Sequence, residues 1–170
     1  SAITAVLLGQ SVEEVTGRGA GLSSEGLERK IKTIQKGIQL NQPNKEDVLD
    51  VLSKVGGLDI AGLVGVFLGC SYYKIPVVVD GFIATVAAFC AMKMQPNSKD
   101  YLLASHTSKE QGARKILEIL GLKPIIDGDL CLGEGSGAVL LFPLLDMAVK
   151  IFLEMDTFDG IQIQAYQPLK

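Results

Sequence analysis

The sequence has few of the side chains that bind metals or form disulfides. It contains one histidine, His106, and three cysteines. The cysteines, Cys70, Cys90 and Cys131, lie far apart among apolar neighbours. A single histidine excludes a His-rich metal site, and this cysteine spacing fits neither a zinc site nor an even disulfide framework. We therefore expect buried, reduced thiols and a reducing, cytoplasmic location.

The chain also lacks clustered basic charge and a long uninterrupted apolar run. The net charge is −3, and the Lys and Arg residues are scattered, so neither a nucleic-acid interface nor a polybasic membrane patch is predicted. The apolar stretch 138–149 is interrupted by Pro143 and Asp146, and the stretch 59–70 is shorter than the roughly 20 residues that span a bilayer. Both stretches are expected to be buried helices. No basic segment precedes an apolar one, as it would in a signal peptide.

What the sequence does contain is an alternation of helical and strand patterns over 170 residues, a length that suits one domain with a hydrophobic core. The patterns predict helices over residues 2–8, 27–38, 46–54, 58–69, 82–94, 109–120 and 138–155, and strands over residues 75–79, 101–104 and, more weakly, 125–126. This alternation predicts an α/β fold with a doubly wound, mostly parallel sheet, right-handed crossovers and helices on both faces.

Local signals predict where several of these elements begin and end. Gly9 is expected to stop the first helix, and Ser11 with Glu14 forms a capping box for a short helical turn. Asn44 is predicted to cap the helix over residues 46–54. The β-branched run 75–79 has the composition of a fully buried strand of a parallel sheet.

A glycine-rich loop, Gly17-x-Gly19-x-Gly21, precedes the clearest helix in the sequence. Glycine amides can face an anion closely, and a helix N-terminus adds positive partial charge, so phosphate binding is one interpretation. Lys30, on the following helix, could lean back towards such a phosphate. A flexible turn is an equally good interpretation of the loop, and a solvated surface lysine is the simpler interpretation of Lys30.

Two polar side chains follow predicted strands, where ligands bind in doubly wound sheets. Asp80 comes directly after the strand over residues 75–79, and His106 follows the strand over residues 101–104. Asp80 could accept hydrogen bonds from ribose hydroxyls, or it could cap the helix that begins near Phe82. The residue pattern favours neither of these two interpretations of Asp80. His106 is better interpreted as a helper or a bystander than as a ligand.

Glu134 lies between Gly133 and Gly135, before the last helix. A substrate could approach this carboxylate closely because its neighbours are not bulky. The helix N-terminus would lower its pKa and apolar neighbours such as Leu132 would raise it, whereas a base for an aromatic nitrogen needs a pKa near neutrality. Considered alone, Glu134 is better explained as a favourable acidic residue at a helix start than as a catalyst.

Taken together, five stretches resemble one family, the nicotinate-nucleotide:dimethylbenzimidazole phosphoribosyltransferases. They are residues 16–22 (TGRGAGL), 54–61 (KVGGLDIA), 75–82 (IPVVVDGF), 101–106 (YLLASH) and 132–138 (LGEGSGA). They occur in the family's order over almost the whole chain. The resemblance implies transfer of the 5-phosphoribosyl group of nicotinate mononucleotide to 5,6-dimethylbenzimidazole. The products would be α-ribazole 5′-phosphate and nicotinate, in the synthesis of the lower ligand of cobalamin.

The resemblance also implies roles for individual residues. Glu134 would be the general base, and Leu132 would belong to the benzimidazole pocket. The phosphate and ribose of the nucleotide would be held by Gly19, Ala20, Gly21 and Lys30. The ribosyl and nicotinate groups would lie beside Asp80, Gly81, Phe82 and Ser108. No metal or organic cofactor is implied, and the family is dimeric.

Members of this family are about twice as long as this chain. The family's Gly-Glu-Met-Gly-Ile-Gly-Asn-Thr-Thr stretch, which contributes to the phosphate site, would immediately precede Ser1. Residues 1–170 are therefore expected to be the C-terminal part of one α/β domain whose sheet is incomplete without the N-terminal half. The last helix, about 138–155, could join a small helical subdomain.

The sequence leaves alternatives for the activity of this chain. The isolated chain is expected to be inactive, and its partner would be the missing half or a second chain. A relative that uses other benzimidazoles or phenolic bases, and a non-catalytic nucleotide-binding fragment, are the alternative functions.

Overall fold

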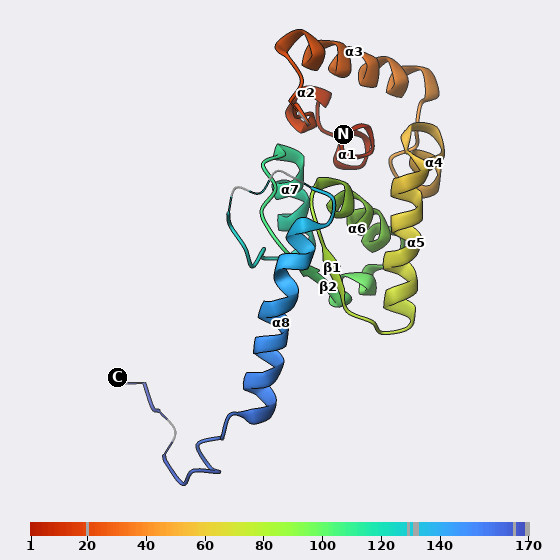
Figure 1. Ribbon diagram of the computed structural model, residues 1–170. Helices are drawn as coiled ribbons and strands as arrows, with labels where there is room; N and C mark the ends of the chain where they lie inside the picture. Colours follow the sequence, from red (N-terminus) through yellow and green to blue (C-terminus); the bar gives the residue numbers. More distant parts are fainter. Residues whose placement is uncertain (20, 129, 131–132, 165, 169–170) are drawn as a thin grey trace.

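A computed structural model describes the chain except for residues 20, 129, 131–132, 165 and 169–170. The chain is mostly helical and contains a small parallel sheet (Figure 1). The helices are α1 (Ala2–Leu8), α2 (Val12–Val15), α3 (Ser24–Asn41), α4 (Val48–Val55), α5 (Leu58–Tyr72), α6 (Phe82–Met94), α7 (Gln111–Leu120) and α8 (Ser136–Glu154), with a 3₁₀ helix η1 (Pro96–Tyr101). The strands are β1 (Val77–Val79) and β2 (Leu102–Ala104).

Most of the predicted helix ends are confirmed, with one correction. Gly9 ends α1 in the left-handed conformation, with φ 62°. The Ser11 Oγ accepts a hydrogen bond from the Glu14 N–H at 3.4 Å and so caps α2. The prediction that Asn44 caps α4 is wrong. Asp47 is the cap, because its carboxylate accepts the first free N–H groups of this helix, and Asn44 instead accepts the N–H of Glu46.

The sheet is parallel, as predicted, and small. Strand β1 pairs with β2 in the register Val77 to Leu102 and Val79 to Ala104. Ile126 extends the sheet through a parallel bridge to His106, which is the weak third strand of the prediction. The chain is therefore an incomplete α/β fold. The expectation of a fully buried first strand is wrong at its start, because Ile75 is 51% exposed and Val77 and Val78 are only half-buried.

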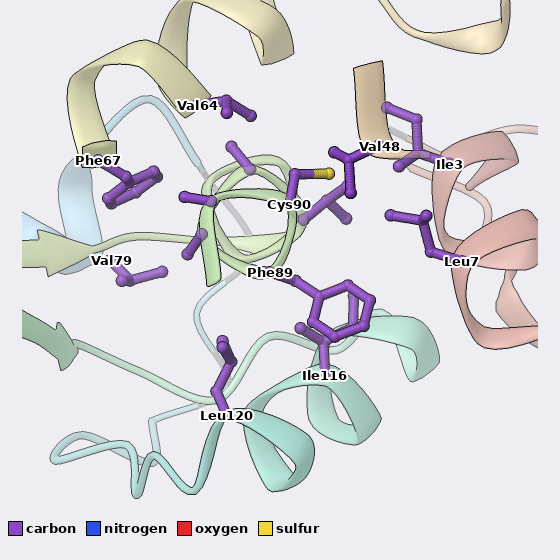
Figure 2. Close-up of a cluster of buried hydrophobic side chains, with 14 of the residues drawn as sticks. Ile3, Leu7, Val48, Val64, Phe67, Val79, Phe89, Cys90, Ile116 and Leu120 are labelled. Atoms are coloured by element: carbon purple, nitrogen blue, oxygen red, sulfur yellow. The ribbon is translucent and has the colours of Figure 1, made fainter. Parts of the chain in front are cut away.

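The core surrounds α6, which is apolar on every side and buries seven consecutive residues, Thr85–Ala91. Small side chains such as Ala87 and Ala88 let neighbouring helices pack close to this helix. Figure 2 shows side chains of α1, α4, α5 and α7 arranged around it. Ile3, Leu7, Val48, Val64, Phe67, Val79, Phe89, Cys90, Ile116 and Leu120 are labelled there. Helix α6 is thus the central element that holds the strand ends in place.

Cys90 lies inside this core, whereas Cys70 on α5 is half-buried. Burial raises the pKa of the Cys90 thiol to about 12. At pH 8 only a fraction on the order of 10⁻⁴ of Cys90 would be thiolate, and the thiolate is the reactive form. We therefore expect iodoacetamide to label Cys90 at least about tenfold more slowly than Cys70 in the native protein. Peptide mapping by mass spectrometry measures both rates. The urea-unfolded protein is the control, and equal labelling of the two thiols in the native protein would contradict the prediction.

Helix α8 extends away from the rest of the molecule (Figure 1). Its residues Gly137 and Leu141 are buried, but Phe152 is 86% exposed and Leu153 is 73% exposed. The expectation that stretch 138–149 is a buried helix is therefore wrong. Stretch 59–70 is likewise buried only at Val64 and Phe67. The hydropathy of a segment predicts that its side chains favour burial, but it does not show which other segment buries them.

By length and composition alone, α8 is one helix that could cross a membrane. This test does not distinguish a membrane span from a helix that packs against another protein segment. Inside α8, Pro143 and Asp146 remain the residues that interrupt the apolar run.

Candidate active site

Glu134 is displayed on a turn of three consecutive residues with left-handed backbone. The φ angles are 76° at Gly133, 57° at Glu134 and 80° at Gly135. Glycine adopts this conformation freely, whereas any other residue is strained by about 1–2 kcal/mol. The Glu134 side chain is exposed to solvent. Strained non-glycine residues concentrate at functional sites, so the conformation marks Glu134 as a functional candidate.

Asp80 anchors this turn to the end of β1. The N–H of Gly135 donates to Asp80 Oδ2 at 3.1 Å, and the N–H of Ala138 donates to Asp80 Oδ1 at 3.0 Å. The carboxylate thus satisfies two of the N–H groups that every helix leaves free at its start. It caps α8 from a distant part of the chain, because no side chain at the start of α8 does so. The hydroxyl of Ser136, the first residue of α8, instead donates to Gly133 O at 2.8 Å.

This arrangement also corrects the alternative that Asp80 caps the helix beginning at Phe82. The N-cap of α6 is Gly81, without a side-chain cap. The Gly81 carbonyl accepts both the N–H and the hydroxyl of Thr85. The ring of Phe82 lies against Gly112 of α7, close enough that a Cβ at Gly112 would meet it at 3.0 Å. Phe82 therefore fastens α6 to α7.

His106 connects the two strand ends with the start of α8. Its Nδ1 lies 2.9 Å from the Ser105 Oγ and 4.0 Å from Asp80 Oδ1. The Ser105 hydroxyl donates to Val79 O at 2.7 Å, which ties β2 to β1. His106 is 5% exposed, and its ring occupies the space that a Cβ at Gly137 would need. Residues of β1, β2 and α8 therefore form one buried polar cluster behind Glu134.

The glycine-rich loop makes a second group with α3 and α7. Gly19 and Gly21 have φ angles of 58° and 101°, and the N–H of Gly19 donates to Glu110 Oε1 at 3.1 Å. Lys30 leans back to the loop, and its Nζ donates to Gly17 O at 2.9 Å. A carboxylate and an ammonium thus lie at the same loop. Ala20, another predicted site residue, lies outside the described residues.

Residues 105–110 run from the first group to the second. After His106, the Ser108 Oγ accepts the N–H of Glu110 at 3.3 Å, and Glu110 reaches the glycine-rich loop. The structure thus places Asp80, Gly81 and Glu134 with one group, and Gly19, Gly21 and Lys30 with the other, with Ser108 on the segment between them. Leu132, the predicted pocket residue, lies outside the described residues.

Sequence reasoning missed Glu110, and it did not predict the contacts of Ser105. Glu110 directly precedes α7, where an acidic residue is ordinary, so its contact with a loop 91 residues earlier left no local signal. Ser105 follows β2 and its hydroxyl faces inward, which the pattern of three strand residues does not reveal. Within the described part of the chain, no group of three His, Cys, Asp or Glu residues could hold a metal ion.

An apolar hollow of about 430 Å³ lies between α4 and α5. Leu49, Leu52, Leu58, Val64, Leu68 and Met94 are among its lining residues. None of the predicted site residues that the structure describes lines it, so it is a separate feature of the surface.

Comparison with known proteins covers nearly the whole chain. A family model described as phosphoribosyltransferase matches residues 1–163. A nicotinate-nucleotide–dimethylbenzimidazole phosphoribosyltransferase from Clostridium acetobutylicum is 49% identical over 170 residues, which are 100% of this chain and 48% of the relative. A protein of the same name from Citrifermentans bemidjiense is 54% identical over 159 residues, which are 94% of this chain and 45% of the relative.

Solved structures agree with these relatives. The crystal structure of CobT from Thermus thermophilus superposes with a TM-score of 0.89 at 42% identity, over 97% of this chain and 49% of that one. A second structure from this organism, of the nicotinate-nucleotide-dimethylbenzimidazole phosphoribosyltransferase, has a TM-score of 0.85 at 41% identity. The chain spans about half the length of the curated relatives it matches. The chain belongs to the nicotinate-nucleotide:dimethylbenzimidazole phosphoribosyltransferase family.

Proposed function

We propose that this chain, within a protein of its relatives' length, transfers the 5-phosphoribosyl group of nicotinate mononucleotide to 5,6-dimethylbenzimidazole. The products are α-ribazole 5′-phosphate and nicotinate. The observation that carries the proposal is the exposed Glu134 on its left-handed turn, anchored by Asp80, in a chain 49% identical to a relative of that name.

In this reaction one nitrogen of the benzimidazole attacks the anomeric carbon of the nucleotide. The bond from that carbon to the nicotinate nitrogen breaks, and nicotinate leaves from the opposite face with the bonding electrons. Glu134 takes the proton from the other benzimidazole nitrogen, so the new nucleotide is neutral at the base. A well-placed general base contributes about 10²–10⁴-fold to the rate. Holding two planar rings on either side of one carbon contributes further.

The glycine-rich loop and Lys30 are proposed to hold the phosphate of nicotinate mononucleotide. Lys30 already points at this loop, where its Nζ donates to Gly17 O. Left-handed glycines can direct backbone N–H groups at an anion. The Glu110 carboxylate, which now accepts the Gly19 N–H, would have to yield that donor to the phosphate.

Replacing Lys30 with methionine should therefore raise the KM for nicotinate mononucleotide by about tenfold, since a hydrogen bond to a charged group is lost. We expect little change in kcat, because the phosphate is remote from the reacting carbon. Steady-state kinetics of the full-length protein measures both. Lys32→Met is the matched control, since Lys32 is exposed on the same helix. A normal KM for Lys30→Met would assign the phosphate to other groups.

We further infer that the half of the protein found in the relatives covers α8 and completes the site. Helix α8 exposes most of its apolar side chains, and this chain spans 48% of the Clostridium acetobutylicum relative. The backbone nitrogen of Ser1 is partly buried and lies close enough to Lys30 and Glu110 to interact electrostatically with both. Residues that precede Ser1 in a longer protein would thus enter the site beside Lys30. A cytoplasmic homodimer is the proposed assembly.

The proposal is tested on the full-length protein with nicotinate mononucleotide and an equimolar mixture of 5,6-dimethylbenzimidazole, benzimidazole and phenol. Mass spectrometry of the products should find α-ribazole 5′-phosphate together with released nicotinate. A phenolic ribotide as the main product would assign the chain a different base. Nucleotide binding without any ribosylated base would make it a binding protein.

A further inference from the structure

We propose that Asp80 is a positioning residue for Glu134. Its carboxylate accepts hydrogen bonds from N–H groups at the start of α8 and does not bind the nucleotide. This inference rests on the proposed function, in which Glu134 is the base. It also assigns Asp80 a different role from the ribosyl or nicotinate contact that the resemblance implies.

Both oxygens of the Asp80 carboxylate are already in use. Oδ2 accepts the N–H of Gly135, the residue directly after Glu134, and Oδ1 accepts the N–H of Ala138. Oδ1 also faces the buried His106 at 4.0 Å. The Asp80 side chain is 19% exposed, so little of it remains for a ligand. Two charge-assisted hydrogen bonds to one backbone turn are a strong and directional attachment.

Glu134 needs such an attachment because few other contacts among the described residues hold its turn. Three consecutive left-handed residues carry the carboxylate. The Ser136 hydroxyl donates to Gly133 O, which lies in the same turn and so does not attach the turn to the strands. Beyond the turn, α8 buries only Gly137 and Leu141. Among the described residues, the position of the base relative to the strand ends is therefore set by Asp80, by the contact of His106 with Gly137, and by Leu141.

An asparagine at position 80 would keep one acceptor and place an N–H₂ group against a second N–H. Asp80→Asn should therefore weaken the attachment of the turn, while a side chain of similar size still fills its place in the buried polar cluster. In the full-length protein we expect kcat to fall by about tenfold, while the KM for nicotinate mononucleotide changes by less than about twofold. Asp80→Glu keeps two acceptor oxygens and should retain more of the kcat than Asp80→Asn. Asp100→Asn, at an exposed position of helix η1, is the control and should match the wild type.

A double-mutant cycle with Glu134→Gln separates positioning from substrate binding. If Asp80 acts through Glu134, adding Asp80→Asn to Glu134→Gln should lower kcat no further, because no base is left to position. Losses that multiply in the double variant, or a raised KM with normal kcat in Asp80→Asn, would overturn the inference and make Asp80 a nucleotide ligand.

Amide hydrogen exchange gives a second readout that does not depend on activity. Asp80→Asn should lose protection at the N–H groups of Gly135 and Ala138, while the core helix α6 keeps its protection. Unchanged exchange at both amides would overturn the inference. If the wild type makes no ribosylated base, the proposed function fails, and the exchange result alone then decides whether Asp80 holds the turn.

Discussion

Glu134→Gln is expected to lower the kcat of the full-length protein by about 10²–10⁴-fold. The amide is nearly the same size as the carboxylate, but it cannot accept the proton of the benzimidazole nitrogen. The affinity for nicotinate mononucleotide should stay close to that of the wild type, because Lys30 and the glycine-rich loop hold the phosphate. Steady-state kinetics and calorimetric titration with the nucleotide measure the two quantities separately.

Two further variants make this result specific. Glu134→Gly removes the carboxylate from a position where glycine relieves backbone strain of about 1–2 kcal/mol, an amount that offsets the extra chain entropy of glycine. It should lose kcat as Glu134→Gln does, without a loss of unfolding free energy. Glu154→Gln, at the exposed far end of α8, should leave kcat unchanged. A normal kcat in Glu134→Gln would remove Glu134 from the chemistry and favour a nucleotide-binding role for the chain.

Gly137→Ala is expected to have the second large effect, although it adds only one methyl group. A Cβ at this position would collide with the His106 ring, and His106 is buried and held by Ser105. Overpacking of this kind costs about 1–3 kcal/mol of stability. The start of α8 must then shift relative to the strand ends, and a misplacement of about 1 Å costs about 10²-fold in rate.

Gly62→Ala is the matched control, because Gly62 also lies in a helix but nothing would meet its Cβ within 4 Å. This variant should be more stable than the wild type by about 0.5–1 kcal/mol, with unchanged kcat. Chemical denaturation and steady-state kinetics compare the two alanine variants. If Gly137→Ala is as stable and as active as Gly62→Ala, the His106 ring is not the close neighbour that fixes α8.

Much of the local structure could be predicted because its causes are local. Helix α6 has the predicted bounds, since thirteen residues of apolar sequence lie between Gly81 and the segment around Pro96. Gly9 stops α1 by its left-handed conformation. The parallel pairing of the two strands also follows from their alternation with helices. The five family-like stretches likewise identify the family from the sequence alone.

The individual site residues depend on contacts that sequence spacing does not express. Asp80 was equally compatible with a ribose contact or a cap on α6, yet its carboxylate caps α8, 55 and 58 residues further along the chain. Glu110 looked like an ordinary helix-start residue, yet it bonds to the glycine-rich loop. Strand crossovers bring these partners together, and only the folded chain specifies the distances between them.

By itself, then, the sequence determined most of the helices, the parallel strands and the family, and it suggested Glu134 as the base only through the resemblance to that family. Those properties depend on residue types, on the spacing of apolar residues and on short motifs, all of which are local features of the sequence. The tertiary structure alone decided that Glu134 lies on a strained turn held by Asp80, and that α8 leaves its apolar side exposed. Both features depend on tertiary contacts between segments that are far apart in the sequence. The hydropathy of α8 shows that it is apolar, and only its contacts in the fold show how much of it is buried.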